Sequence, residues 1–194
     1  MEPSLSQKER IISTPLAYGL FVPLTNLRLP GFIKPNRGDL VIFQPPYVKP
    51  NPWYISILDP FVRFFTLQRI SMKEDQKSSL ETPVMAKRII GIPGDTVKVN
   101  NFVAFIKPEG QEQFVREFEL IKKEYNITPN SGNGGILYKN LLGGYKEILL
   151  SGNQYFILGD NRNGSQDSLS WGPVSFDSIK SKVILSYWPK VKFR

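Results

Sequence analysis

Proline and glycine interrupt this sequence so often that long helices are excluded. The chain of 194 residues contains 16 Pro and 15 Gly. Proline breaks a helix interior because it lacks a backbone donor, and glycine weakens one. With 41% hydrophobic residues the chain still has enough apolar side chains for a core, and its length suits one domain, with or without an insertion. We therefore expect a mainly β fold rather than a helical bundle.

The chain contains neither histidine nor cysteine. The absence of cysteine excludes disulfides, a thiol nucleophile and cysteine-type zinc or Fe–S sites. The absence of histidine excludes a Ser-His-Asp triad and an imidazole base near neutral pH. If the protein is a hydrolase, its general base must therefore be a carboxylate, a lysine or an amine.

An excess of basic residues limits the partners. The 25 Lys+Arg and 17 Asp+Glu give a formal net charge of +8, which suits an anionic membrane surface or a nucleic acid. No nucleic-acid-binding signature is present, so we do not expect nucleic acid as a partner. A basic nucleic-acid-binding β-domain stays as a rival that predicts retention falling steeply with salt. Ile11 to Leu27 is interrupted by Pro15 and Pro23, so no membrane-spanning helix is expected.

Short apolar runs bounded by turn residues predict six β-strands, at 39–43, 84–92, 96–99, 102–106, 154–158 and 182–188. Between the third and fourth runs, Asn100-Asn101 predicts a two-residue hairpin loop, because asparagine tolerates positive φ.

Two stretches have a different pattern. In Gln111–Tyr125 four apolar residues recur at helical spacing, which predicts an amphipathic helix: Phe114, Phe118, Ile121 and Tyr125. Asp59–Met72 combines clustered aromatic residues with Arg63 and Arg69. It has two interpretations, a short helix packed on the core or an aromatic and basic surface in a lipid headgroup region.

Lys87 lies inside an apolar run, where period-two geometry places it on one face with Met85 and Ile89. A solvent-facing strand lysine is one interpretation. The other is a buried lysine, whose pKa of ~10.4 can fall by up to ~3–5 units on desolvation. A neutral amine could accept a proton from a serine hydroxyl. In a chain without histidine, this is the natural way to activate an oxygen nucleophile.

A polar segment follows the run at 154–158 and extends from Gly159 to Gly172. It is either an ordinary polar turn or a structured loop with defined partners. In the second case Asp160 could pair with Arg162, and Asp167 could hold a cation or a backbone N–H.

Taken in order, these segments resemble the bacterial type I signal peptidases, or leader peptidases, which are membrane-bound serine proteases with a Ser–Lys dyad. Met1-Glu-Pro-Ser-Leu5 is similar to the end of the nucleophile motif Ser-Met-x-Pro-Thr-Leu, and Tyr18–Asn26 to the segment after it. Arg37–Phe43, Lys87–Asp95 and Gly159–Gly172 match the three later motifs. Four motifs in the right order make the resemblance specific.

The resemblance implies roles for individual residues. Lys87 corresponds to the general base and Ser165 to the hydroxyl that orients its amine. A structural shell would surround them, formed by Asp160, Asn161, Arg162 and Asp167. Substrate-binding residues would include Met1, Pro3 and Met85.

The resemblance also implies a fold and a function. The fold would consist of coiled antiparallel sheets, with a catalytic β core at 1–104 and 151–194. Residues 105–150, with loops at 130–135 and 143–144, would form a small α/β cap insertion. The function would be removal of signal peptides from exported preproteins, with no metal or organic cofactor. The catalytic domain would lie on the outer face of the cytoplasmic membrane, and the substrate would pair as a strand beside Lys87.

The sequence departs from the family pattern at three places. The nucleophilic serine of the family stands directly before the Met that matches Met1, so the sequence begins just after it. A start placed one codon too late, or a trimmed chain, would explain this; the alternative is a catalytically inactive homologue that binds preproteins or membrane. Leu169 replaces a usual arginine, which we expect to affect stability or tuning more than the reaction. The connection at 44–83 is longer than usual.

Overall fold

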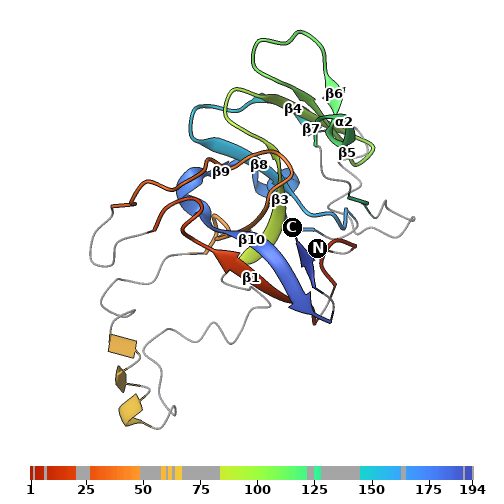
Figure 1. Ribbon diagram of the computed structural model, residues 1–194. Coiled ribbons are helices and arrows are strands. Elements are labelled where there is room, and N and C mark those ends of the chain that lie inside the picture. The colour runs from red at the N-terminus through yellow and green to blue at the C-terminus, as the bar shows by residue number, and fades with distance from the viewer. Residues whose placement is uncertain are drawn as a thin grey trace.

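The computed structural model describes residues 1, 3–6, 8–20, 27–48, 58–59, 61–62, 64–66, 84–121, 125–127, 145–162, 165–189 and 191–193. These residues form two antiparallel sheets and little helix (Figure 1), which confirms the predicted mainly β fold. Most of the connection at 44–83 lies outside the described residues, as do 21–26 and the two predicted loops of the cap. No helix in the described part of the chain is long and apolar enough to cross a bilayer.

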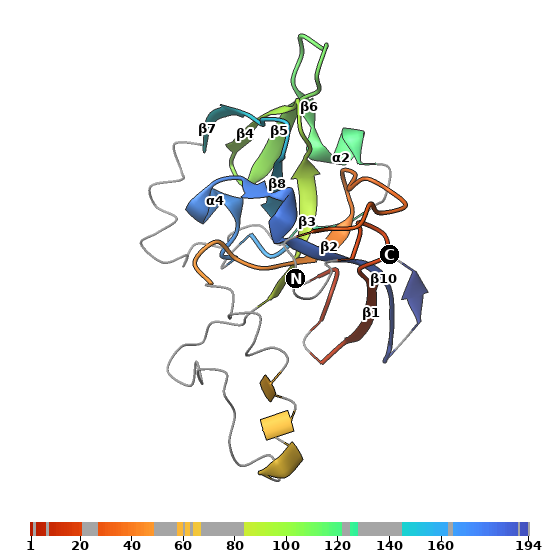
Figure 2. The same ribbon diagram turned by 90° about the vertical axis from the view of Figure 1, so that its left-hand side faces the viewer.

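The larger sheet has seven strands in the order β1-β10-β2-β3-β8-β9, with β11 paired to β10. The strands are β1 (Arg10–Thr14), β2 (Leu40–Phe43), β3 (Met85–Gly91), β8 (Gln154–Leu158), β9 (Val174–Ser175), β10 (Ile179–Trp188) and β11 (Lys192–Phe193). Four of them confirm predicted strands, although β10 begins three residues earlier than 182. Both views place β3, a strand of the larger sheet, near the centre of the molecule (Figures 1 and 2).

The smaller sheet has the order β6-β5-β4-β7, formed by β4 (Thr96–Asn100), β5 (Val103–Lys107), β6 (Val115–Arg116) and β7 (Tyr145–Leu149). The β4–β5 hairpin was predicted, but its loop lies one residue later. Asn100 pairs with Val103, so Asn101 and Phe102 form the loop, with φ of 47° and 66°. This sheet draws on residues on both sides of 104, and the division into a core and a cap at 105–150 stays a prediction.

The prediction of a helix over Gln111–Tyr125 is wrong for most of its length. Val115 and Arg116 form β6, and the described helix α2 covers only Glu117–Leu120. Helical spacing of apolar residues was outweighed by pairing of β6 with Phe105 and Ile106 on β5, because tertiary contacts routinely override local propensity.

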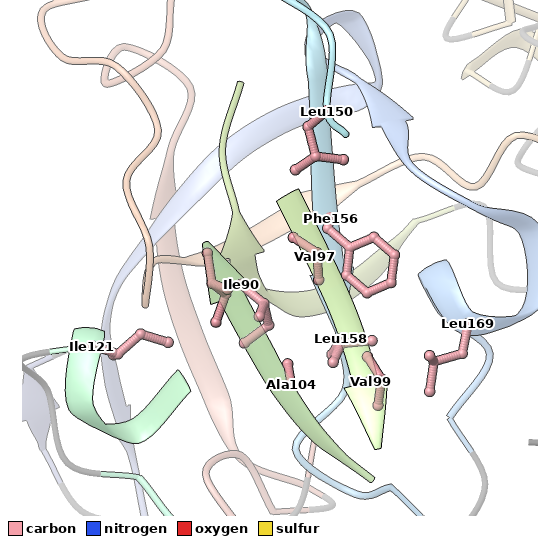
Figure 3. Packing of buried hydrophobic residues seen from close by; sticks show 10 residues of the cluster. Ile90, Val97, Val99, Ala104, Ile121, Leu150, Phe156, Leu158 and Leu169 are labelled. Atoms are coloured by element: carbon pink, nitrogen blue, oxygen red, sulfur yellow. The ribbon is translucent and has the colours of Figure 1, made fainter. Parts of the chain in front are cut away.

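The largest apolar cluster lies between the two sheets (Figure 3). It combines residues of β3 and β8 with residues of β4 and β5, and Leu169 of α4 (Ser168–Trp171) closes one side. A second cluster, around Phe43 and Ile89, packs on β2, β3 and β8. A third, smaller cluster joins Leu5, Leu40 and Val183. Together they fix β3 and the start of the chain relative to the segment after β8.

Candidate active site

Lys87 points into the protein rather than into solvent. It lies on β3, paired with Val41 of β2, and its Nζ donates a hydrogen bond of 2.6 Å to Ser165 Oγ. Burial lowers the pKa of Lys87, while the nearby carboxylates of Asp167 and Asp160 act in the opposite direction. Of the two interpretations of this lysine, the structure therefore favours the buried one.

Ser165 is held between Lys87 and Asp167. The Ser165 side chain forms a hydrogen bond that lowers the Asp167 pKa, so the hydroxyl donates to the carboxylate while its oxygen accepts from Lys87. A neutral lysine amine has two N–H donors and one lone pair. With one N–H fixed on Ser165, the orientation of that lone pair is restricted.

Asp167 holds the loop after β8 in place. Its two oxygens accept backbone N–H groups from Gly159 at 2.9 Å and from Leu169 at 3.1 Å, the second as the N-cap of α4. Burial raises the pKa of Asp167, and these hydrogen bonds together with the charge of Lys87 oppose that rise. The expectation that Asp167 could hold a backbone N–H is confirmed.

The expected pair between Asp160 and Arg162 is wrong. Asp160 instead accepts two hydrogen bonds from Arg88, at 2.9 and 2.7 Å, and Arg162 pairs with Glu117 at 2.7 Å. In both pairs the partner comes from another element. Arg88, the partner of Asp160, lies on β3, and Glu117, the partner of Arg162, lies on α2. Two residues close in sequence on a tight turn need not face one another, and long-range partners satisfy both charges here.

Arg88 joins the start of the chain to the site. Beyond Asp160, its guanidinium donates to the carbonyl of Gly38 and to Ser4 Oγ, both at 2.9 Å. Its charge also lies over the ring of Tyr125, at 4.1 Å from the ring centroid. Arg88 therefore ties the chain around Ser4 to the strand that carries Lys87.

The three residues expected to bind substrate do not form one group. Met1 is half-buried against the third apolar cluster, where Ala86 of β3 also packs. Met85 packs against the second cluster, and Pro3 is exposed. Asn161 is half-buried between Asp160 and Arg162. The start of the chain thus lies beside β3, on residues that flank Lys87.

Comparison with known proteins identifies the family of this chain. The family model described as "Signal peptidase, peptidase S26" matches residues 1–188. The chain belongs to the signal peptidase family. This agrees with the resemblance found in the sequence motifs, and it makes the chain a member of a family of serine peptidases.

Two relatives show how far the similarity extends. Thylakoidal processing peptidase 1, chloroplastic, of Arabidopsis thaliana is 26% identical over 194 residues, which is 99% of this chain and 40% of that protein. Signal peptidase IB of Staphylococcus aureus is 30% identical over 109 residues, 56% of this chain and 55% of that protein. This signal peptidase chain thus spans about half or less of the length of these relatives. A crystal structure of a signal peptidase I from Enterococcus faecalis V583 aligns with 77% of this chain and 96% of that chain, at 21% identity and a TM-score of 0.38.

Three residues of this signal peptidase site were missed by sequence reasoning: Arg88, Glu117 and Tyr125. Arg88 had a signal, since it follows Lys87 directly and continues an apolar strand. Glu117 and Tyr125 had none, because both lay in a stretch read as an amphipathic helix, where a charged or aromatic residue needs no special partner.

Proposed function

We propose that this chain carries the base and the supporting residues of a serine endopeptidase that removes signal peptides from exported preproteins. The observation that carries the proposal is the half-buried Lys87, whose Nζ lies 2.6 Å from Ser165 Oγ. A lysine with a lowered pKa can act as general base where histidine is absent. Lys87 is the general base in this proposal, and Ser165 orients its amine.

The reaction needs a serine directly before Met1, which the family motif places there. Its hydroxyl oxygen attacks the carbonyl carbon of the scissile bond, and Lys87 takes the hydroxyl proton. The tetrahedral intermediate collapses, the C–N bond breaks, and Lys87 returns the proton to the leaving amine. Water then hydrolyses the acyl-enzyme by the same route. Backbone N–H groups beside the serine would stabilise the oxyanion.

The strand arrangement supports binding of substrate as an added strand. β8 pairs with β3 at Arg88, Ile89 and Gly91. Among the described residues, no strand pairs with this same edge of β3 at Met85 to Lys87. An extended signal peptide could pair there, beside Met85 and Lys87.

The experiment compares three forms of the chain on a synthetic preprotein peptide with an Ala-x-Ala cleavage site, read by mass spectrometry. One form is extended by a short peptide ending in Ser before Met1, a matched form ends in Ala, and the third is the chain alone. Cleavage after the second Ala by the Ser form alone supports the proposal. In the Ser form, Lys87→Ala should abolish cleavage while the folded state is kept. Binding without cleavage by all three forms would favour the inactive homologue.

We also infer an anionic membrane surface as a partner, at the outer face of the cytoplasmic membrane. Phe61, Phe64 and Phe65 lie in a short helical segment and expose 60%, 76% and 80% of their surface. Exposed aromatic rings favour the membrane interface, and the net charge of +8 favours anionic lipids. Their exposure supports the lipid interpretation of 59–72 over packing on the core.

A further inference from the structure

Glu117 is a fully buried carboxylate that comes from outside the active-site segments. It lies on α2, beside the smaller sheet, and both oxygens are hydrogen-bonded. Oε1 accepts the Ala104 N–H at 2.9 Å and Arg162 Nη1 at 3.1 Å. Oε2 accepts Arg162 Nη2 at 2.7 Å and the Tyr125 hydroxyl at 2.5 Å. A buried charge with this many partners is held firmly, since leaving any of them unpaired would be costly.

Arg162 connects Glu117 to the loop after β8. Its side chain is fully buried, and its Nε donates to the Gly159 carbonyl at 2.9 Å, while Nη1 also donates to the Phe102 carbonyl. Burial works to lower the pKa of Arg162, but Glu117, with smaller contributions from Tyr125 and Asp167, raises it overall. Glu117 is thus the main partner of the Arg162 charge.

Gly159 is the point at which this chain of contacts reaches the base. Its N–H is fixed by Asp167 and its carbonyl by Arg162. Its Cα lies so close to the site that an added β-carbon would be 2.0 Å from Ser165 Oγ and 3.2 Å from Lys87 Nζ. The position of Gly159 therefore sets how near Ser165 and Lys87 can lie.

We propose that Glu117 is a positioning residue for the Lys87–Ser165 pair, acting through Arg162 and the Gly159 carbonyl. Without the Glu117 charge, the buried guanidinium lacks its counter-charge and is drawn to Asp167, with which it already interacts electrostatically. Asp167 then releases Gly159, and the loop moves away from Lys87. Contacts with α2, beside the smaller sheet, thus help the loop after β8 to hold the Lys87–Ser165 pair in place. The effect on rate rests on the proposed function; the effect on Lys87 does not.

The first test needs no peptidase activity. Acetylation of Lys87 by acetic anhydride, followed against pH in the chain as it stands and quantified by peptide mass spectrometry, gives the midpoint at which the amine becomes reactive. The charged groups near the amine are Asp160 and Asp167, and Arg88 is the next residue on its own strand. Because burial is the largest influence on its pKa, loosening the loop should raise the midpoint toward that of an ordinary lysine.

Glu117→Gln should raise this midpoint, and the matched control Glu119→Gln, an exposed residue on the same helix, should leave it unchanged. Glu117→Asp, which keeps the charge, should restore part of the wild-type value. If Glu117→Gln does not fold, Tyr125→Phe decides, since it removes one hydrogen bond to Glu117 and keeps the ring; a smaller shift in the same direction is expected. A lower stability with a midpoint unchanged or lowered would overturn the proposal.

The second test uses the form extended by Ser. Glu117→Gln should lower kcat at least about tenfold, since general bases contribute on the order of 10²–10⁴ in rate, with KM changed by less than about twofold. Wild-type kcat in folded Glu117→Gln would refute the positioning role. If the extended wild-type chain cleaves nothing, the proposed function fails, and the acetylation midpoints still decide the role of Glu117.

Discussion

Gly159 and Ser165 lie so close together that no other residue fits at position 159 without a shift. A β-carbon on Gly159 would be 2.0 Å from Ser165 Oγ and 2.7 Å from its Cβ, well inside van der Waals contact. The same carbon would be 3.2 Å from Lys87 Nζ. The hydroxyl and the amine therefore meet over the backbone of Gly159, in space that a side chain would otherwise occupy.

Replacing Gly159 by alanine should remove nearly all cleavage by the Ser-extended form. The methyl group would displace the Ser165 side chain and break its 2.6 Å hydrogen bond to Lys87, since both cannot occupy one volume. The measurement is kcat on the preprotein peptide. Gly152→Ala is the matched control, because a β-carbon there meets nothing within 4 Å. Full activity of Gly159→Ala would show that Ser165 need not lie against Gly159.

Ser165→Ala should slow cleavage but less severely than Lys87→Ala. The substitution removes the hydrogen bond that orients the amine and leaves the amine in place, so a loss of about tenfold is expected, on the scale of one hydrogen bond. Ser170→Ala, an exposed residue of the same segment, should match wild type. Equal losses in Ser165→Ala and Lys87→Ala would contradict the distinction between orienting group and base.

The sequence predicted those site residues that belong to the family motifs. Lys87, Ser165 and Asp167 were named from the lysine motif and the last motif, and the structure brings them together. Glu117 could not be named in this way, because its role depends on packing of the smaller sheet against the loop after β8. The stretch that carries it contains apolar residues at helical spacing, and only strand pairing with β5 showed otherwise.

Cleavage activity should rise with pH at values below the pKa of an ordinary lysine. Lys87 acts as base only when neutral, and burial lowers its pKa. Activity should therefore rise with pH through this lowered pKa and reach its plateau before pH ~10.4, the value for a free lysine. The measurement is kcat against pH for the Ser-extended form. A rise only at the free-lysine value would contradict the buried base.

The same lowered pKa affects stability, in a direction that linkage fixes. Between the folded and the unfolded pKa of Lys87, the unfolded state binds more protons, so the free energy of unfolding rises with pH across this window. Each unit of lowering corresponds to about 1.4 kcal/mol. Urea unfolding of wild type and Lys87→Met isolates the contribution of Lys87. Their difference should shift in favour of wild type as pH rises, and a difference independent of pH would refute the lowered pKa.

Phe65→Ser should weaken binding to vesicles that contain anionic lipid. The ring is 80% exposed, so its loss removes interfacial contact area without opening a core. Phe32→Ser is the matched control, because Phe32 is 86% exposed on another segment. Co-sedimentation with phosphatidylcholine vesicles, with and without phosphatidylglycerol, measures both variants. Equal loss in the two would mean that aromatic surface in general, rather than the segment around Phe65, binds the vesicles.

Leu169 stands where the family usually has arginine, and its surroundings are apolar. The side chain is 9% exposed and lies in the cluster between the sheets (Figure 3), with Val99 and Leu158 among its members. Leu169→Ala should lower the free energy of unfolding by about 2–5 kcal/mol, the usual effect of a cavity.

Leu169→Arg tests whether the family residue fits this chain. A guanidinium in the cluster would be desolvated. The nearby carboxylate of Asp167 already accepts hydrogen bonds from the Gly159 and Leu169 N–H groups, one on each oxygen. We expect a loss of unfolding free energy at least as large as for Leu169→Ala, with kcat of the folded fraction within about threefold of wild type, because surrounding contacts hold the base. Urea unfolding measures the first and preprotein cleavage the second. Wild-type stability of Leu169→Arg would mean that the arginine pairs with a carboxylate. In that case the apolar packing of Leu169 and the ion pair of the family's arginine would stabilise the fold equally.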